Sequence, residues 1–135
     1  MGLGRVLIVD DEADLRKSLR VILAKAGYDV VEAADGEEAV RTIRSGDNPL
    51  IVDAIICDLV MPKMNGMEAI AFFRDQFPGV PVVVLTGHPN VENAADLFKQ
   101  GVVDYLVKPV IPEKLLAVAK KAVNSHELFK DQFAT

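Results

Sequence analysis

The stretch AIICDLVMPKMNG, from Ala54 to Gly66, joins the composition of a buried strand to a charged residue. Four apolar residues precede Asp58, and Pro62 then interrupts any regular element. A short, continuous apolar run is typical of a strand that is buried on both faces of a parallel sheet. An ionised carboxylate at the end of such a strand is costly unless it has partners or an altered pKa. The stretch therefore predicts that other segments of the chain bring partners to Asp58.

Four further apolar runs lie on either side of this stretch, and segments of helical periodicity separate them. The runs are Val6 to Val9, Tyr28 to Ala33, VPVVVLTG over residues 80–87, and VVDYLV over residues 102–107. A helix is expected after each strand, over residues 15–26, 35–43, 65–77, 90–100 and 112–123. Five strands alternating with five helices predict an α/β fold with a parallel sheet covered on both faces.

Composition restricts the class of protein. The chain has 135 residues, half of them hydrophobic, which fits one domain, expected over residues 4–124. Residues 125–135 are expected to form a C-terminal tail or the start of a linker, with His126 on its surface. A net charge of -5 argues against direct binding to nucleic acid or an anionic membrane. One cysteine, no signal peptide and no long apolar stretch favour a cytoplasmic protein.

Polar residues stand at the carboxyl ends of four of the five expected strands. Asp10 and Asp11 follow the first strand and Asp58 ends the third, while Thr86 and Lys108 stand at the ends of the fourth and fifth. In an open parallel sheet these ends share one edge, where ligands bind. Three neighbouring carboxylates repel one another, and a hard divalent cation with oxygen ligands relieves that repulsion. The sequence therefore predicts a Mg²⁺ site, and an aspartate, a lysine and a hydroxyl beside the metal suit phosphoryl transfer.

Four motifs at these strand ends resemble one known family. They are VDDE, CDLVMPKMNG, LTGH and DYLVKP, and in this order they are similar to the receiver domains of bacterial two-component response regulators. The resemblance covers the chain from Arg5 to Val123. It implies a flavodoxin-like, doubly wound sheet with strand order 2-1-3-4-5. It also implies a phosphoacceptor signalling domain rather than an enzyme, one that assists its own phosphorylation and dephosphorylation.

The resemblance assigns a role to each residue of the expected site. Asp58 would accept a phosphoryl group, with Lys108 and Thr86 contacting the phosphoryl oxygens. Asp11 and Asp58 would ligate Mg²⁺ directly, Asp10 would act mainly through water, and the main-chain carbonyl of Val60 would complete the protein ligands. Pro109 would follow a cis peptide bond.

The resemblance further implies a switch and a set of partners. Successive side chains of a strand point to opposite faces, so Tyr105 and Leu106 face opposite sides of the fifth strand, and Tyr105 is expected to point away from the phosphorylation site. In receivers, the residue at the Thr86 position moves toward the phosphoryl group and the aromatic residue at the Tyr105 position turns inward. This movement changes the surface of the fourth helix, fifth strand and fifth helix. The implied phosphodonor is a sensor histidine kinase or a phosphotransfer protein. The output would be an attached domain, such as one that controls transcription, or a homodimer formed on phosphorylation.

Two other functional classes share part of this pattern. A haloacid-dehalogenase-like phosphatase also uses aspartate, threonine, lysine and Mg²⁺, but its nucleophile follows the first strand in an Asp-x-Asp pattern, whereas here Glu12 stands two positions after Asp10. A flavodoxin-like module that binds flavin mononucleotide needs a Ser/Thr/Gly-rich phosphate loop after the first strand. This chain has Asp10 and Asp11 there, which would repel a phosphate.

Overall fold

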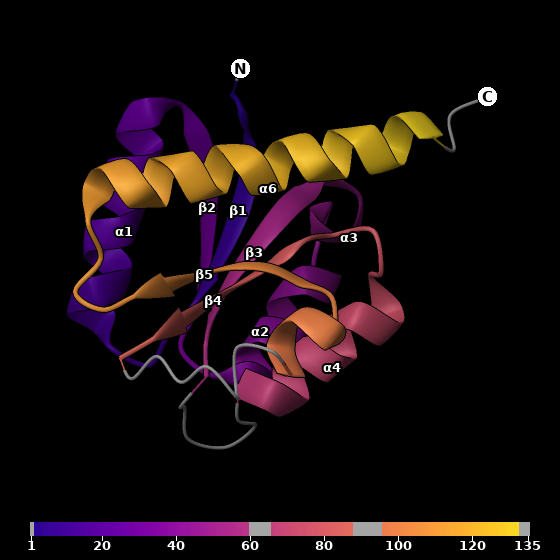
Figure 1. Cartoon of the computed structure of the whole chain (residues 1–135), viewed down its shortest axis with the longest axis horizontal. Helices are drawn as coiled ribbons and strands as arrows, with labels where there is room; N and C mark the ends of the chain where they lie inside the picture. The colour runs from indigo at the N-terminus through magenta and orange to yellow at the C-terminus, as the bar shows by residue number, and fades with distance from the viewer. Residues whose placement is uncertain (1, 60–65, 88–95, 133–135) are drawn as a thin grey trace.

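A five-stranded parallel sheet forms the centre of the protein in its computed structural model, which describes residues 2–59, 66–87 and 96–132 (Figure 1). The strands are β1 (Gly4–Val9), β2 (Tyr28–Ala33), β3 (Val52–Asp58), β4 (Val82–Thr86) and β5 (Val102–Val107). Their order is β2-β1-β3-β4-β5, and every neighbouring pair is parallel. The predicted fold class and strand order are confirmed.

Helices connect the strands, and one of them was not predicted from the sequence. They are α1 (Ala13–Ala26), α2 (Gly36–Arg44), α3 (Asn48–Ile51), α4 (Gly66–Gln76) and α6 (Pro112–Gln132), and residues 96–99 are also helical. The sequence analysis expected five helices and missed α3, so the described residues contain one helix more. A single turn is too short to show helical periodicity, and tertiary contacts hold this one in place. The side-chain oxygen of Asn48 accepts a hydrogen bond from Arg5, and its amide nitrogen donates one to the carbonyl of Thr42.

The helices divide between the two faces of the sheet. α1 and α6 cover one face, and α2 and α4 cover the other (Figure 1). Side chains that alternate along each strand enter the two hydrophobic clusters in turn. In β3, for example, Ile55 and Cys57 pack on the α4 side, whereas Ala54 and Ile56 pack on the α6 side. All seven residues of β3 are buried, as the apolar run predicts for the central strand.

Local signals account for the helix ends. The Asp35 side chain accepts a hydrogen bond of 2.8 Å from the Glu38 N–H and so caps the start of α2. Gly27 ends α1 with a φ of 108°, a left-handed conformation that glycine adopts without the steric penalty of a Cβ atom. Among residues 2–59, 66–87 and 96–132, no helix combines the length and the apolar composition that a membrane span needs.

The last helix extends beyond the predicted domain boundary at residue 124. α6 continues without a break to Gln132, so the segment after residue 124 is helical as far as it is described. His126 is only 7% exposed rather than at the surface, and its ring contacts Asp53. The interpretation of His126 as a surface residue is therefore wrong, while the domain boundary at residue 124 stays a prediction.

Candidate functional site

The carboxyl edge of the sheet brings together the charged residues singled out in the sequence. One oxygen from each of Asp10, Asp11 and Asp58 lies within 4.8 Å of the other two. Lys108, which follows β5, places its Nζ 3.1 Å from Asp58 Oδ2 and 3.1 Å from Asp10 Oδ2. We call Asp10, Asp11 and Asp58 the acidic cluster. The positions are close because parallel strands end at the same edge, and β3 lies beside both β1 and β4.

Two residues of the acidic cluster are buried, and one faces solvent. Asp10 is fully buried and Asp58 is 4% exposed, whereas Asp11 is exposed. Burial raises the pKa of Asp10, and the charge of Asp58 acts in the same direction. The Glu12 N–H and the Lys108 ammonium group oppose that rise but do not cancel it. In the absence of a further cation, the cluster therefore carries an electrostatic cost.

The backbone around Asp10 holds its side chain in a defined orientation. Asp10 Oδ1 accepts a 2.7 Å hydrogen bond from the Glu12 N–H, and the Asp10 carbonyl accepts one of 2.6 Å from Arg16 Nη1. Asp10 Oδ2 is buried without a hydrogen bond from any described residue, although Lys108 lies 3.1 Å away as an ion-pair partner. A buried carboxylate oxygen of this kind beside two more carboxylates fits a hard divalent cation.

Lys108 supplies a positive charge to the site, and it has a third partner that the sequence analysis missed. Its Nζ lies 3.0 Å from Glu12 Oε1, in addition to its contacts with Asp10 and Asp58. Burial opposes the charge on Lys108, but the three carboxylates outweigh burial and raise the pKa of the ammonium group. Lys108 is therefore a permanent positive charge at neutral pH. Glu12 stands directly after Asp11 in the VDDE motif, and that position is the only sequence signal that pointed to it.

Thr86 ends β4 and is half-buried. Its carbonyl accepts a 2.8 Å hydrogen bond from the Lys108 N–H, which joins the end of β4 to the residue after β5. The peptide bond between Lys108 and Pro109 is cis, the form that the family resemblance implies. Val60 lies outside the described residues.

Tyr105 lies on the opposite side of β5 from Leu106. Leu106 belongs to the hydrophobic cluster under α6, while Tyr105 packs against the other cluster. The Tyr105 ring makes an edge contact with the Phe98 ring, with centroids 6.3 Å apart, and Phe98 is 47% exposed. Tyr105 therefore connects the core to a partly exposed aromatic surface.

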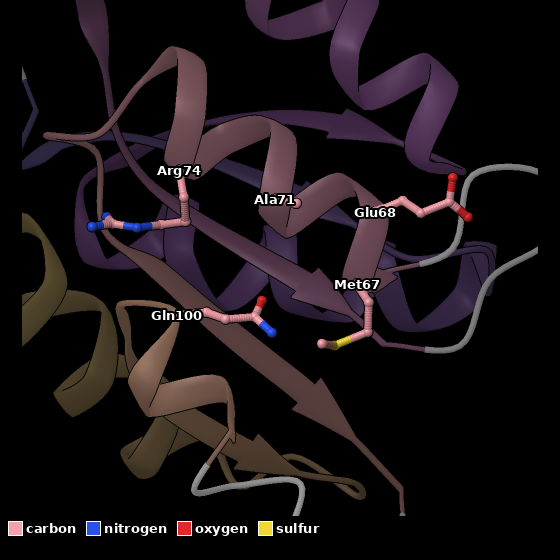
Figure 2. A pocket seen from close by; sticks show the side chains of 5 residues that line it. All are labelled: Met67, Glu68, Ala71, Arg74 and Gln100. Atoms are coloured by element: carbon pink, nitrogen blue, oxygen red, sulfur yellow. The ribbon is translucent and has the colours of Figure 1, made fainter.

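A shallow groove lies between α4 and residue 100 (Figure 2). Its volume is about 480 Å³, and its described lining is Met67, Glu68, Ala71, Arg74 and Gln100. The described lining of the groove includes no residue of the acidic cluster, so the groove is separate from the site expected from the sequence.

Comparisons with known proteins agree with this arrangement. Residues 6–120 match the response regulator receiver domain family. The alginate biosynthesis transcriptional regulatory protein AlgB of Pseudomonas aeruginosa is 34% identical over 93% of this chain and 27% of its own length. The response regulator MprA of Mycobacterium ulcerans is 37% identical over 96% of this chain and 54% of its own length. The chain thus spans about a quarter to a half of these curated relatives.

A solved structure gives the same result. The chemotaxis protein CheY4 of Vibrio cholerae superposes with a TM-score of 0.80 and 34% identity, covering 88% of this chain and 98% of CheY4. The family match over most of the chain favours the receiver over the phosphatase and flavin-binding alternatives, each of which shares only part of the sequence pattern. The chain belongs to the response regulator receiver domain family, the signalling domains of two-component phosphorelays.

Proposed function

We propose that this domain is a phosphoacceptor and that Asp58 is the residue that receives the phosphoryl group. The observation that carries the proposal is the position of Asp58 at the end of β3, 4% exposed, next to a lysine and two further aspartates. The phosphodonor is a phosphohistidine on a sensor histidine kinase or a phosphotransfer protein, as family membership suggests.

The transfer is a displacement at phosphorus. A carboxylate oxygen of Asp58 attacks the phosphorus atom, the phosphorus–nitrogen bond breaks, and the imidazole leaves with the bonding electron pair. Lys108 is already 3.1 Å from Asp58 Oδ2, so its ammonium group can pair with the incoming phosphoryl oxygens after a small movement. The Thr86 hydroxyl supplies a further hydrogen bond to those oxygens from the neighbouring strand.

A Mg²⁺ ion is the proposed cofactor, and the acidic cluster holds it. Asp11 and Asp58 would be the direct carboxylate ligands, Asp10 would act mainly through water, and the main-chain carbonyl of Val60, outside the described residues, would be the remaining protein ligand. When bound, the ion neutralises negative charge on the carboxylates and the phosphoryl oxygens. The contribution of the protein is to hold Asp10 and Asp58 close together and almost without solvent.

The proposed output is a change of surface around Tyr105. Thr86 moves toward the phosphoryl group, and Tyr105 turns into the space that Thr86 leaves, which alters the surface formed by residues 96–99, β5 and α6. That surface controls an output domain in cis or a homodimer. AlgB is named a transcriptional regulatory protein, and this supports a transcriptional output. The domain assists its own phosphorylation and dephosphorylation and otherwise acts as a signalling element.

Acetyl phosphate, a small phosphodonor, tests the proposal. In the presence of Mg²⁺, the wild-type chain should gain the mass of one phosphoryl group, and the label should be lost in base. Asp58→Asn should gain none. Asp53→Asn is the matched control, because Asp53 is also a buried aspartate of β3, and it should label like the wild type. Normal labelling of Asp58→Asn would show that another residue is the acceptor.

A further inference from the structure

A second buried carboxylate stands at the other end of β3. Asp53 is 6% exposed, and its Oδ1 lies 2.8 Å from Nδ1 of His126, which is 7% exposed. Lys130 Nζ approaches the same oxygen at 3.4 Å. His126 and Lys130 are four residues apart on α6 and so project from the same side of the helix. A carboxylate near the start of β3 thus receives two groups from the end of the last helix.

An irregularity in the sheet directs Asp53 toward α6. Arg5 of β1 pairs with Val52 and Val6 pairs with Ala54, so Asp53 is an extra residue on β3 without a partner in β1. Val52 packs in the cluster under α4, whereas Ala54 packs in the cluster under α6. With regular alternation both would face the same side. A bulge of this type re-aims a side chain, and here it points Asp53 to the α6 side of the sheet.

The start of β1 is shaped to receive the second oxygen of Asp53. The Arg5 N–H donates a 3.0 Å hydrogen bond to Asp53 Oδ2. Gly4 has a φ of 138°, and a Cβ atom there would lie 2.7 Å from Asp53 Oδ2 and 3.2 Å from Val123 Cγ1. Glycine therefore lets β1 approach both the carboxylate and α6. Both oxygens of Asp53 have polar partners, which offsets the cost of burying its charge.

His126 occupies a position where the packing of α6 would accept an apolar residue. The buried side chains of α6 recur at Leu115, Ala119, Ala122 and then His126, which is helical spacing. A buried imidazole costs free energy unless its polar nitrogens find partners, and Asp53 supplies one. Partial burial opposes the charge on Lys130, but the attraction of Asp53 and Glu127 outweighs it and raises the pKa of Lys130. The family match ends at residue 120, before both residues.

We propose that Asp53, His126 and Lys130 form an intramolecular latch that holds residues 125–132 of α6, the C-terminal extension, against the amino-terminal edge of the sheet. The extension then moves with the domain as one body instead of acting as a separate linker. The latch lies at the opposite end of β3 from the acidic cluster, so anchoring of the extension and phosphoryl chemistry use two different carboxylates of one strand.

Hydrogen exchange of backbone amides tests the latch. His126→Phe keeps a ring of similar shape but removes the donor to Asp53. Exchange in residues 125–132 should become faster by about tenfold or more, the effect of losing roughly one hydrogen bond to a charged group, while residues 113–121 exchange as in the wild type. Ser125→Ala is the control in the same segment, because Ser125 is exposed, and it should not accelerate exchange. Exchange of the extension in His126→Phe within twofold of the wild type would overturn the latch.

Two further measurements test the latch without relying on the folding of His126→Phe. In the wild type, nitrogen NMR should find a proton on Nδ1 of His126, because only a protonated Nδ1 can donate to a carboxylate, and a proton on Nε2 alone would contradict the latch. Lys130→Met removes the second contact at a residue whose side chain is 45% exposed, and it should also speed exchange of the extension. If exchange of the extension in Lys130→Met is as slow as in the wild type, the contact of Lys130 with Asp53 does not hold the extension. Neither measurement depends on phosphorylation.

Discussion

Lys108 Nζ lies 3.1 Å from Asp58 Oδ2, although 50 residues separate them in the chain. The same nitrogen is 3.1 Å from Asp10 and 3.0 Å from Glu12. One lysine therefore offsets part of the repulsion among several carboxylates before any ligand binds. The balance is incomplete, since the pKa of Asp10 remains raised by its burial and by Asp58. The first two predictions follow from this remaining cost.

Mg²⁺ should stabilise the folded domain. An ion that binds only the folded state adds about 2.7 kcal/mol at 100 times its Kd, so the melting temperature should rise with millimolar Mg²⁺. Asp11→Asn removes one negative charge and one ligand, and it should melt higher than the wild type without metal and respond less to Mg²⁺. Asp75→Asn, at an exposed position of α4, should respond like the wild type. A wild-type melting curve indifferent to Mg²⁺ would count against a metal site.

Asp10 should make the stability of the metal-free domain depend on pH. Its folded pKa is raised above the ordinary value of 3.8, so the folded state holds this proton more tightly than the unfolded state does. The stabilisation that comes from protonated Asp10 is fully present below pH 3.8, and it is lost as the pH rises through the folded pKa. Asp10→Asn cannot lose a proton. In urea titrations with a chelator, it should therefore exceed the wild type in unfolding free energy near neutral pH, and the difference should shrink on acidification. A difference that is constant with pH would refute this origin.

Thr86 should couple the phosphoryl site to Tyr105. With beryllofluoride, a mimic of aspartyl phosphate, the Tyr105 ring resonances of the wild type should shift and self-association should increase. Thr86→Ala should still bind the mimic but lose most of the Tyr105 change. Tyr28, the other tyrosine, is buried in the cluster under α1 and α6 and serves as an internal control whose resonances should stay constant. A wild-type response from Thr86→Ala would disprove the coupling.

Gly101 should be intolerant of a side chain. Its φ is 95°, and a Cβ atom would lie 2.6 Å from Arg74 Nε. Gly101→Ala should lower the free energy of unfolding by about 1–3 kcal/mol, measured by urea denaturation. Gly87→Ala is the control, because a Cβ at Gly87 meets no described residue within 4 Å and its φ is outside the strained range. If both variants lose the same stability, neither the φ of Gly101 nor the close approach of Arg74 is the cause. Gly101→Ala combined with Arg74→Ala should recover the part of the loss that the clash contributes.

The sequence by itself predicted the sheet and the residues that meet at its carboxyl edge. Apolar runs such as Ala54 to Cys57 identify buried strands because a parallel sheet covered on both faces requires them. In a parallel sheet the carboxyl ends share one edge, and the strand order that the family resemblance implies places Asp10 and Asp58 on adjacent strands, with Lys108 following the second strand beyond. The positions of these residues at strand ends and the arrangement of the strands were enough to predict the site, without any measured distance.

The tertiary structure alone decided the contacts that depend on register and on long-range packing. The pattern of β3 does not reveal the bulge at Asp53, because one extra residue reverses the side that a side chain faces without changing the apolar composition. His126 is 73 residues from Asp53, and it is buried because α6 packs on the side of the sheet that Asp53 faces. The contact of Glu12 with Lys108 spans 96 residues and likewise depends on long-range packing. Periodicity specifies which face of an element is buried, whereas polar pairing also requires the relative position of two elements, and only the packed fold supplies it.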